Sequence, residues 1–379
     1  MLYTPLLKLF IKISRYSIFC VCLLLTACFT STSSTSTTQQ SELDIAVKGI
    51  INHTVTPALD SFSQQTEELD ALANSVCDAN TKTEAELLAL QKQWIETNKS
   101  WFKLIPYLLG PLTTKDFLTA EAYLYIDSYR QRGQDGSGAI RSDISALLIS
   151  DEINKADFSS KNFDTVGLLA LEILLFEASD TQSNSITDIA TEFQNIAKKC
   201  DILIGQTYEL NRRMAVIHQA WHQDYRDTGK GYQDLLLNKL LEQTFTEDND
   251  IDGTGTPAFT RLVLAVQSHL DYLNKRNVTT DTAQLSNSIW QALAETHSSI
   301  NTFLAGTGEN ALTLYDMMGN GYDNNVNTLI VNMASFKLAI DESNTTDFNS
   351  FAATLDGNFK RELPESLDTA LGLNFSDGD

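Results

Sequence analysis

The sequence predicts an all-α protein made of two helical bundles packed side by side. Apolar residues recur at intervals of three and four along nearly the whole chain, which is the spacing of amphipathic helices. The 379 residues include six prolines, and no run of β-branched residues alternates with polar ones as in a strand. Because each such helix must bury its apolar face, we expect the helices to pack on one another.

The first 27 residues have the features of a bacterial secretory signal. Residues 1–15 contain three basic side chains and no acidic one, and an apolar stretch follows at 18–25. This stretch is shorter than the ~20 residues that a membrane-spanning helix needs. The residues Leu25-Thr26-Ala27-Cys28 match the lipobox, where the signal is cut and the cysteine is lipidated. We therefore expect a signal peptide at 1–27 and a lipid on Cys28; the alternative is an ordinary signal followed by an incidental cysteine.

The residues after the lipobox predict a tether to a membrane. Residues 29–40 read FTSTSSTSTTQQ, and a segment so rich in Ser and Thr has little apolar surface to bury. Phe29, not Asp, follows Cys28, which in the enterobacterial sorting pattern directs a lipoprotein to the outer membrane. We thus expect residues 28–40 to join a lipid anchor to the folded domains of an exported protein that faces the periplasm or the cell surface.

The charge of the chain limits its partners. The formal net charge is −22, and it becomes −25 once the three basic residues of the signal are removed. A surface this acidic argues against a nucleic-acid partner and against electrostatic attachment to anionic lipids. It fits an extracytoplasmic domain, including one that meets cations.

Two cysteines remain once the signal and the lipidated Cys28 are set aside. They are Cys77 and Cys200. In an oxidising compartment such a pair is expected to form a disulfide rather than a metal site. The alternative is two separate buried thiols.

The helical segments fall into two predicted domains. Thr83-x-x-Glu86 is a capping box, and Thr256-Pro257 supplies an N-cap and a first-turn proline to a later helix. Residues 247–256, EDNDIDGTGT, form the most loop-like stretch after the tether. We expect an N-terminal bundle at 41–228 and a C-terminal bundle at 229–379.

One helix contains an isolated charge. Residues 166–176 read VGLLALEILLF, and a helix that is apolar on every side is buried on every side. Glu172 interrupts this run. A buried carboxylate must be paired, protonated, hydrogen-bonded or bound to a cation, so Glu172 is the first candidate site residue. The alternative is a structural role, with the carboxylate held by a neighbouring Arg, Tyr or backbone group.

Four segments of the chain resemble those of one protein family, in the same order. Residues 51–77 resemble its opening helix, Trp94 and then Gly110-Pro111 its tryptophan helix and turn, and Ile126-Asp127-Ser128-Tyr129 its Ile-Asp-x-Trp segment. Residues 167–176 resemble its Gly-x-His-x-x-Glu helix. The family is that of the imelysin-like bacterial lipoproteins, which includes an insulin-cleaving metallopeptidase of outer membranes. The resemblance implies a fold of two helical bundles and a role in iron uptake.

The sequence departs from this family at the motif itself. A His three residues before the Glu would share its helix face and could bind the same cation. Leu169 occupies that place, and Ile105 occupies a place where the tryptophan helix often has Glu. The remnant Gly167, Leu169 and Glu172 is therefore not expected to bind metal or to cleave peptides.

The same residues suggest where a ligand would bind. We expect a pocket between the bundles lined by Trp94, Asp127 and Glu172. Glu172 would supply charge there, and Asp127 a second carboxylate if the two helix faces meet.

Two histidines are a weaker metal candidate. His218 and His222 are four residues apart on a predicted helix, the spacing of zinc-binding His-Glu-x-x-His helices. Gln219 takes the place of the Glu that acts as general base in that motif, so peptidase chemistry is not expected here. The alternative is a pair of ordinary surface or half-buried imidazoles.

An acidic turn resembles half of a calcium loop. Asp248, Asp250, Asp252 and Gly253 match the first half of the EF-hand pattern. Phe259 stands where the loop needs its bidentate Glu. The alternative is an acidic turn between domains.

Together these observations predict a non-catalytic binding or accessory lipoprotein. It would be anchored in the outer membrane, and the family resemblance implies a role in iron acquisition with iron-uptake proteins as partners. The alternative is a metallopeptidase that takes its ligands from elsewhere, such as Glu172 with Asp127 or the His218/His222 pair. Calcium or a transition metal are the cofactors that these patterns leave open.

Overall fold

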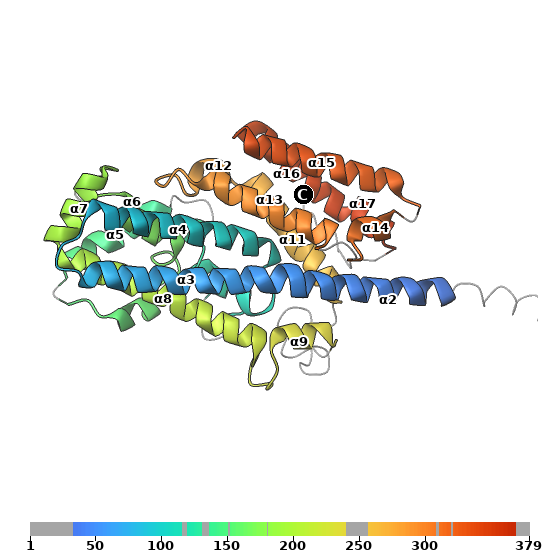
Figure 1. The fold of residues 1–379 in the computed structure, drawn as a ribbon, viewed down its shortest axis with the longest axis horizontal. Coiled ribbons are helices and arrows are strands. Elements are labelled where there is room, and N and C mark those ends of the chain that lie inside the picture. The colour runs from blue at the N-terminus through green and yellow to red at the C-terminus, as the bar shows by residue number, and fades with distance from the viewer. Residues whose placement is uncertain are drawn as a thin grey trace, which may run out of the picture. The chain divides into compact units, whose positions relative to one another are not determined.

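Helices account for all the regular structure in the residues that can be described. The structure, a computed structural model, describes residues 33–115, 120–130, 136–150, 152–179, 181–239, 257–307, 311–319 and 321–368 (Figure 1). The predicted signal peptide and Cys28 lie outside these residues. Within them, no helix is long and apolar enough to cross a bilayer.

The elements divide into longer helices and short helical turns. The longer ones are α2 (Ser33–Ile50), α3 (Thr56–Asp78), α4 (Glu84–Leu104), α5 (Gly136–Leu148), α6 (Leu168–Phe176), α7 (Ile186–Asn195), α8 (Ala197–His222), α11 (Ala258–Lys275), α13 (Ile289–Ala305), α15 (Asp323–Asp341) and α16 (Thr345–Lys360). The shorter ones are η1 (Ile51–Val55), η2 (Ile105–Tyr107), η3 (Gly110–Leu112), η4 (Ala122–Tyr125), η5 (Ser128–Arg130), η6 (Lys155–Ser160), α9 (Tyr232–Leu237), α12 (Val278–Asp281), α14 (Leu314–Met318) and α17 (Glu362–Ser366).

Helix α2 begins earlier than the composition predicts. It starts at Ser33, inside the segment 28–40 for which Ser and Thr predict a flexible tether. A helix is costly to nucleate and cheaper to extend, so a helix established by later residues can continue back through weak helix formers. By its contacts the chain divides into Met1–Ile45 and a compact unit from Ala46 onward.

Helices α3 and α8 run antiparallel, and three contacts fix their register. The predicted disulfide is present and joins Cys77 to Cys200 with 5.4 Å between their Cα atoms. Further along, Thr207 donates to Asp70 at 2.8 Å, and the Trp221 indole donates to the Thr56 hydroxyl at 3.0 Å. The residue numbers of the partners rise along α3 as they fall along α8, so the two helices are antiparallel. These three contacts hold the α3–α8 interface, here called the seam, along its length.

Helix α4 begins at the predicted capping box. Thr83 accepts from the Glu86 amide, and the Glu86 carboxylate accepts from the Thr83 amide at 2.8 Å. Apolar residues that recur at helical spacing along α4 are buried, and they are Leu87, Leu90, Trp94, Trp101 and Leu104. These side chains pack α4 against the neighbouring helices, among them α3 and α13.

The helices after residue 257 pack on one another and on α4 (Figure 1). Helix α13 lies against α4, where the Thr296 hydroxyl donates to the Phe102 carbonyl at 2.7 Å and Ser299 donates to the Lys103 carbonyl at 2.7 Å. Helix α11 begins at Ala258 with Pro257 at the N-cap position, one residue later than predicted. The predicted boundary loop at 247–256 lies outside the described residues, so the division into bundles near residue 228 stays a prediction.

Candidate functional site

The glycine of the motif remnant is required by a close approach of two backbone segments. Gly167 has φ +94°, in the region that side chains avoid. A Cβ atom there would lie 2.5 Å from the Ile126 carbonyl oxygen and 2.7 Å from that of Tyr125. The Leu168 amide donates to the same Ile126 oxygen at 2.9 Å. Gly167 therefore docks the start of α6 against the Ile-Asp-Ser-Tyr segment.

Glu172 is buried, as predicted, and both of its carboxylate oxygens are occupied by protein donors. Tyr129 donates its hydroxyl to Oε2 at 2.6 Å. The amide and hydroxyl of Ser286 both donate to Oε1, at 2.9 and 2.8 Å. Ser286 lies between α12 and α13, so the carboxylate fastens α6 to a turn far along the chain.

The surroundings of Glu172 favour the neutral acid more than water does. Burial raises the pKa of Glu172, and the hydrogen bonds from Tyr129 and Ser286 oppose that rise. Desolvation, followed by the nearby Glu172 charge, raises the pKa of Tyr129 well above its ordinary value, so its phenol remains a donor. This environment holds a carboxyl group in place and leaves it few lone pairs for another ligand.

The metal that the family motif implies does not fit these residues. Leu169 is buried in an apolar cluster with side chains of α5, α6 and α8 and of the turn η6, namely Ile140, Ile144, Phe158, Ala170, Ile173, Leu174 and Ile202. Ile105 is also buried. An aliphatic side chain offers no ligand atom, and the oxygens of Glu172 already accept hydrogen bonds. The motif is a packing element in this chain.

The other predicted pocket residues lie on one buried face of α4 and the segment beside it. The Trp94 indole donates to the Leu168 carbonyl at 3.1 Å, and the Trp101 indole donates to Asp127 Oδ2 at 3.1 Å. Asn98 lies between them on that face, and its buried amide has no hydrogen-bond partner among the described residues. Trp94, Asp127 and Glu172 are thus all buried in or beside α6, and the pocket that they were predicted to line stays a prediction.

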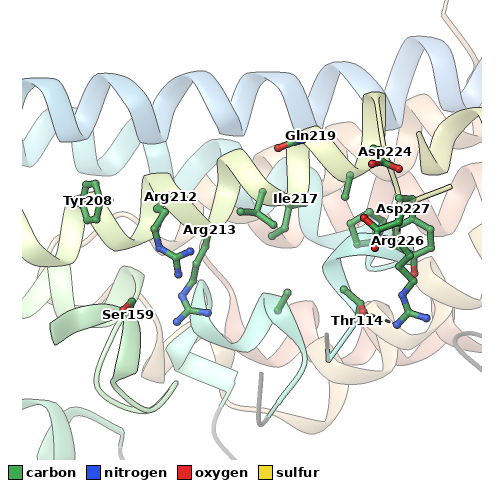
Figure 2. A pocket seen from close by; sticks show the side chains of 15 residues that line it. Thr114, Ser159, Tyr208, Arg212, Arg213, Ile217, Gln219, Asp224, Arg226 and Asp227 are labelled. Atoms are coloured by element: carbon green, nitrogen blue, oxygen red, sulfur yellow. Dashed lines mark hydrogen bonds between the residues drawn. The ribbon is translucent and has the colours of Figure 1, made fainter. Parts of the chain in front are cut away.

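A cavity of about 800 Å³ lies along α8, away from these three residues (Figure 2). Its lining includes Tyr208, Arg212 and Arg213 on α8, with Thr114 and Arg226 from other segments. Figure 2 shows Arg212 and Arg213 extending from α8 on the same side. No local pattern in the sequence indicates this cavity, because its polar residues come from segments far apart.

Arg213 is the most enclosed charge of this cavity. It is 6% exposed, pairs with Glu209 through Nε at 2.5 Å, and stacks on Tyr125 at 3.9 Å from the ring centre. Glu209 is shared, because Arg212 also binds it through two contacts at 2.8 and 2.9 Å. Burial lowers the pKa of Arg213, and Glu209 opposes that shift. Its Nη2 atom has no hydrogen-bond partner among the described residues.

The two predicted histidines lie beside a third residue, Asp60, that the sequence analysis did not single out. Asp60 of α3 lies opposite them, with its Oδ1 atom 3.1 Å from His218 Nε2 and 2.7 Å from His222 Nε2. The two imidazole rings are 4.4 Å apart. One carboxylate and two imidazoles therefore converge from two helices. Asp224, near the pair in sequence, instead accepts from the Gly229 amide at 2.8 Å.

Two predicted sites lie outside the described residues. They are the lipidation site at Cys28 and the half calcium loop of Asp248, Asp250 and Asp252.

Comparison with solved structures shows the fold. An imelysin-like protein from Psychrobacter arcticum 273-4 matches with a TM-score of 0.65 and 16% identity, over 90% of this chain and 98% of that one. A protein assigned as an iron-regulated protein A precursor, from Parabacteroides distasonis ATCC 8503, matches with a TM-score of 0.57 and 10% identity, over 86% and 95%. At such identities the likeness concerns the fold alone.

One protein-family model matches most of the chain. A search among curated proteins found no match. The model of the imelysin family, peptidase M75, matches residues 55–370, which include α6, α8 and the helices after residue 257. This match shows that the chain, with its all-α fold and altered motif, belongs to the imelysin family.

Proposed function

We propose that this imelysin-family chain is a non-catalytic binding or accessory protein. The observation that carries the proposal is the state of the motif helix. Leu169 is packed in an apolar cluster, and both oxygens of Glu172 accept hydrogen bonds from Tyr129 and Ser286. A metallopeptidase needs a metal with an open position for water, and this helix supplies neither the imidazole nor an available carboxylate.

A combined metal and peptidase measurement tests the absence of catalysis. The full chain, purified in detergent, is incubated with zinc and an unfolded polypeptide, and cleavage is followed by mass spectrometry. We expect no cleavage above a blank, and no change of bound metal between wild type and Glu172→Gln. Cleavage that Glu172→Gln abolishes would establish a metallopeptidase with non-standard ligands and overturn the proposal.

The binding role is supported by the cavity on α8. Guanidinium groups are suited to carboxylates because their donors match both oxygens of the ligand. Arg213 lines this cavity, and its buried Nη2 atom has no hydrogen-bond partner among the described residues. Iron is soluble outside cells mainly in chelated form, and carboxylate chelates are anionic. The iron-regulated assignment of a structural neighbour supports an iron-related role for the chain, and we place that role at this cavity because of its arginines.

Binding of ferric citrate tests that role. We expect equilibrium dialysis to show saturable binding that Arg213→Met weakens at least about tenfold, the scale of ~1.4 kcal/mol for one charged hydrogen bond. Arg212→Met, at a more exposed position, provides a second variant if Arg213→Met folds poorly. Arg276→Met removes an equal charge from an exposed position just after another helix and should leave binding unchanged. No binding by wild type, or equal loss in all three variants, would remove the iron part of the proposal.

The lipobox is the basis for a proposal on export and anchoring. We propose that the chain is cut before Cys28 and held in the outer membrane by lipid on that residue. Metabolic labelling with a radioactive fatty acid should mark wild type and leave Cys28→Ser unlabelled, with the variant released into the soluble fraction. Labelling of Cys28→Ser would contradict this anchor.

A further inference from the structure

We propose that Asp60, His218 and His222 bind a divalent first-row transition-metal ion. The proposal does not depend on the proposed function and concerns a different place in the fold. It rests on the convergence of three ligand atoms from two helices, all within 4.8 Å of one another. Two of the separations, 3.1 and 2.7 Å, run from the two imidazole nitrogens to the same carboxylate oxygen.

These separations are hydrogen-bond distances, somewhat shorter than the distances between the ligands of one ion. A transition metal binds imidazole nitrogen at about 2.0–2.1 Å and carboxylate oxygen at about 2.0–2.2 Å. Ligand atoms around a tetrahedral ion are then roughly 3.3 Å apart. Small rotations of the three side chains would bring the nitrogens and an oxygen of Asp60 to these positions around one ion.

The backbone is well suited to hold the three side chains in place. His218 and His222 are one helical turn apart on α8, so their side chains leave the same face. Asp60 lies opposite them because the register of α3 and α8 is fixed on both sides. The Trp221–Thr56 hydrogen bond lies beside the cluster, and the Cys77–Cys200 disulfide closes the far end of the seam. Ligands on two fastened helices lose little entropy when they bind.

The ligand types select the class of ion. Neutral imidazole favours zinc, copper, iron and nickel, whereas calcium and magnesium prefer oxygen ligands. Two histidines with one carboxylate leave open positions for water or a ligand, as in zinc sites with three protein ligands and in non-haem iron sites. The side chains are 37%, 26% and 46% exposed for His218, His222 and Asp60, so an ion can enter from solvent.

The cluster does not restore peptidase chemistry of the His-Glu-x-x-His type. In that motif the residue after the first His is a Glu that activates the bound water. Here it is Gln219, which lines the cavity on α8 rather than joining the cluster. An amide is not a general base. The site is therefore proposed for binding of an ion and for no reaction.

Metal titration of the full chain in detergent tests the site. After treatment with chelator, zinc and cobalt(II) binding is measured by equilibrium dialysis with elemental analysis, and cobalt(II) also by its visible absorption. We expect one ion per chain in wild type. His218→Ala, His222→Ala and Asp60→Asn should each lower the affinity at least about 100-fold, since loss of even an outer partner of a ligand costs 10–100-fold.

Matched controls separate this site from incidental binding. His53→Ala removes an exposed imidazole from η1, and Glu67→Gln removes an exposed carboxylate from α3; both should bind like wild type. Glu172→Gln should also keep the ion, which distinguishes this site from the motif helix. Zinc should raise the melting temperature of wild type and not of Asp60→Asn. No ion on wild type, or equal binding by wild type and the three cluster variants, would overturn the proposal.

Discussion

The motif helix α6 and the α3–α8 seam differ in what surrounds their polar side chains. On α6, Glu172 is 1% exposed, and protein donors occupy both of its oxygens. On the seam, Asp60 and two histidines converge where solvent reaches them. The first region has the family's spacing without its chemistry, and the second has ligand chemistry without the family's spacing. A motif therefore predicts a site only when the partners of its residues leave their ligand atoms available.

The largest effect is expected from breaking the seam. Cys77→Ser with Cys200→Ser opens a loop of 123 residues, which in the chain-entropy model costs about 5 kcal/mol. Chemical denaturation, compared with wild type under non-reducing conditions, measures this loss. The variant should still bind zinc, more weakly, because the Trp221–Thr56 contact remains beside the cluster. Unchanged stability would mean that packing alone sets the register of the seam.

A slightly smaller effect is expected from a methyl group at the start of α6. Gly167→Ala places a Cβ 2.5 Å from the Ile126 oxygen at a positive φ, so strain and overpacking together should cost roughly 4 kcal/mol. Gly138→Ala is the control. No atom lies within 4 Å of a Cβ there, and the position is helical, so stability should rise by about 0.5–1 kcal/mol. Thermal and denaturant unfolding of both variants would measure the contrast; equal effects would contradict the close approach.

Replacing Leu169 by the histidine of the family motif should destabilise the protein and should not create a metal site. Leu169→His puts an imidazole into a cluster of aliphatic and aromatic side chains, at a cost of about 3 kcal/mol. Glu172 would still be held by Tyr129 and Ser286, so zinc binding should match that of wild type in dialysis. A second zinc ion bound by this variant would mean that the motif helix lacks only its histidine.

For the motif helix and for the α3–α8 seam, the sequence predicts the helices better than it predicts which distant residues contact them. Helical spacing of apolar residues and a capping box identify α4, and a continuous apolar run identifies α6. The isolated charge in that run identifies Glu172, and the number of remaining cysteines identifies the disulfide. Ser286 could not be predicted as a partner of Glu172, because 114 residues separate them and no local pattern joins them. Tertiary packing decides such a contact.

Asp60 is different, because a signal for it was present in the sequence. If Cys77 and Cys200 are paired and the two helices are antiparallel, counting back from Cys77 to Asp60 corresponds to counting forward from Cys200 to Ile217. That residue is next to His218. The disulfide, once predicted, therefore indicates which acid of α3 faces the histidines. No comparable pattern in the sequence predicts the cavity on α8, because Thr114 and Arg226 line it from irregular segments.

The smallest expected effect, a difference in pH dependence, separates the buried carboxylate from an exposed one. The pKa of Glu172 is raised by burial, so the folded state binds its proton more tightly than the unfolded state does. Stability from this group is then highest below the ordinary pKa and falls as pH rises through the raised one, by about 1.4 kcal/mol for every tenfold difference in proton affinity between the two states. Glu172→Gln keeps an acceptor and removes the charge, so its stability relative to wild type should improve from pH 4 to pH 7.

Glu86 should behave in the opposite way. Its hydrogen bonds with Thr83 lower its pKa, so its contribution is present above the ordinary pKa and is lost as pH falls. Glu86→Gln should therefore become less stable relative to wild type over the same rise in pH. Denaturant midpoints measured at several pH values for both variants would show slopes of opposite sign. Slopes of the same sign would mean that the hydrogen bonds from Tyr129 and Ser286 outweigh burial and lower the pKa of Glu172.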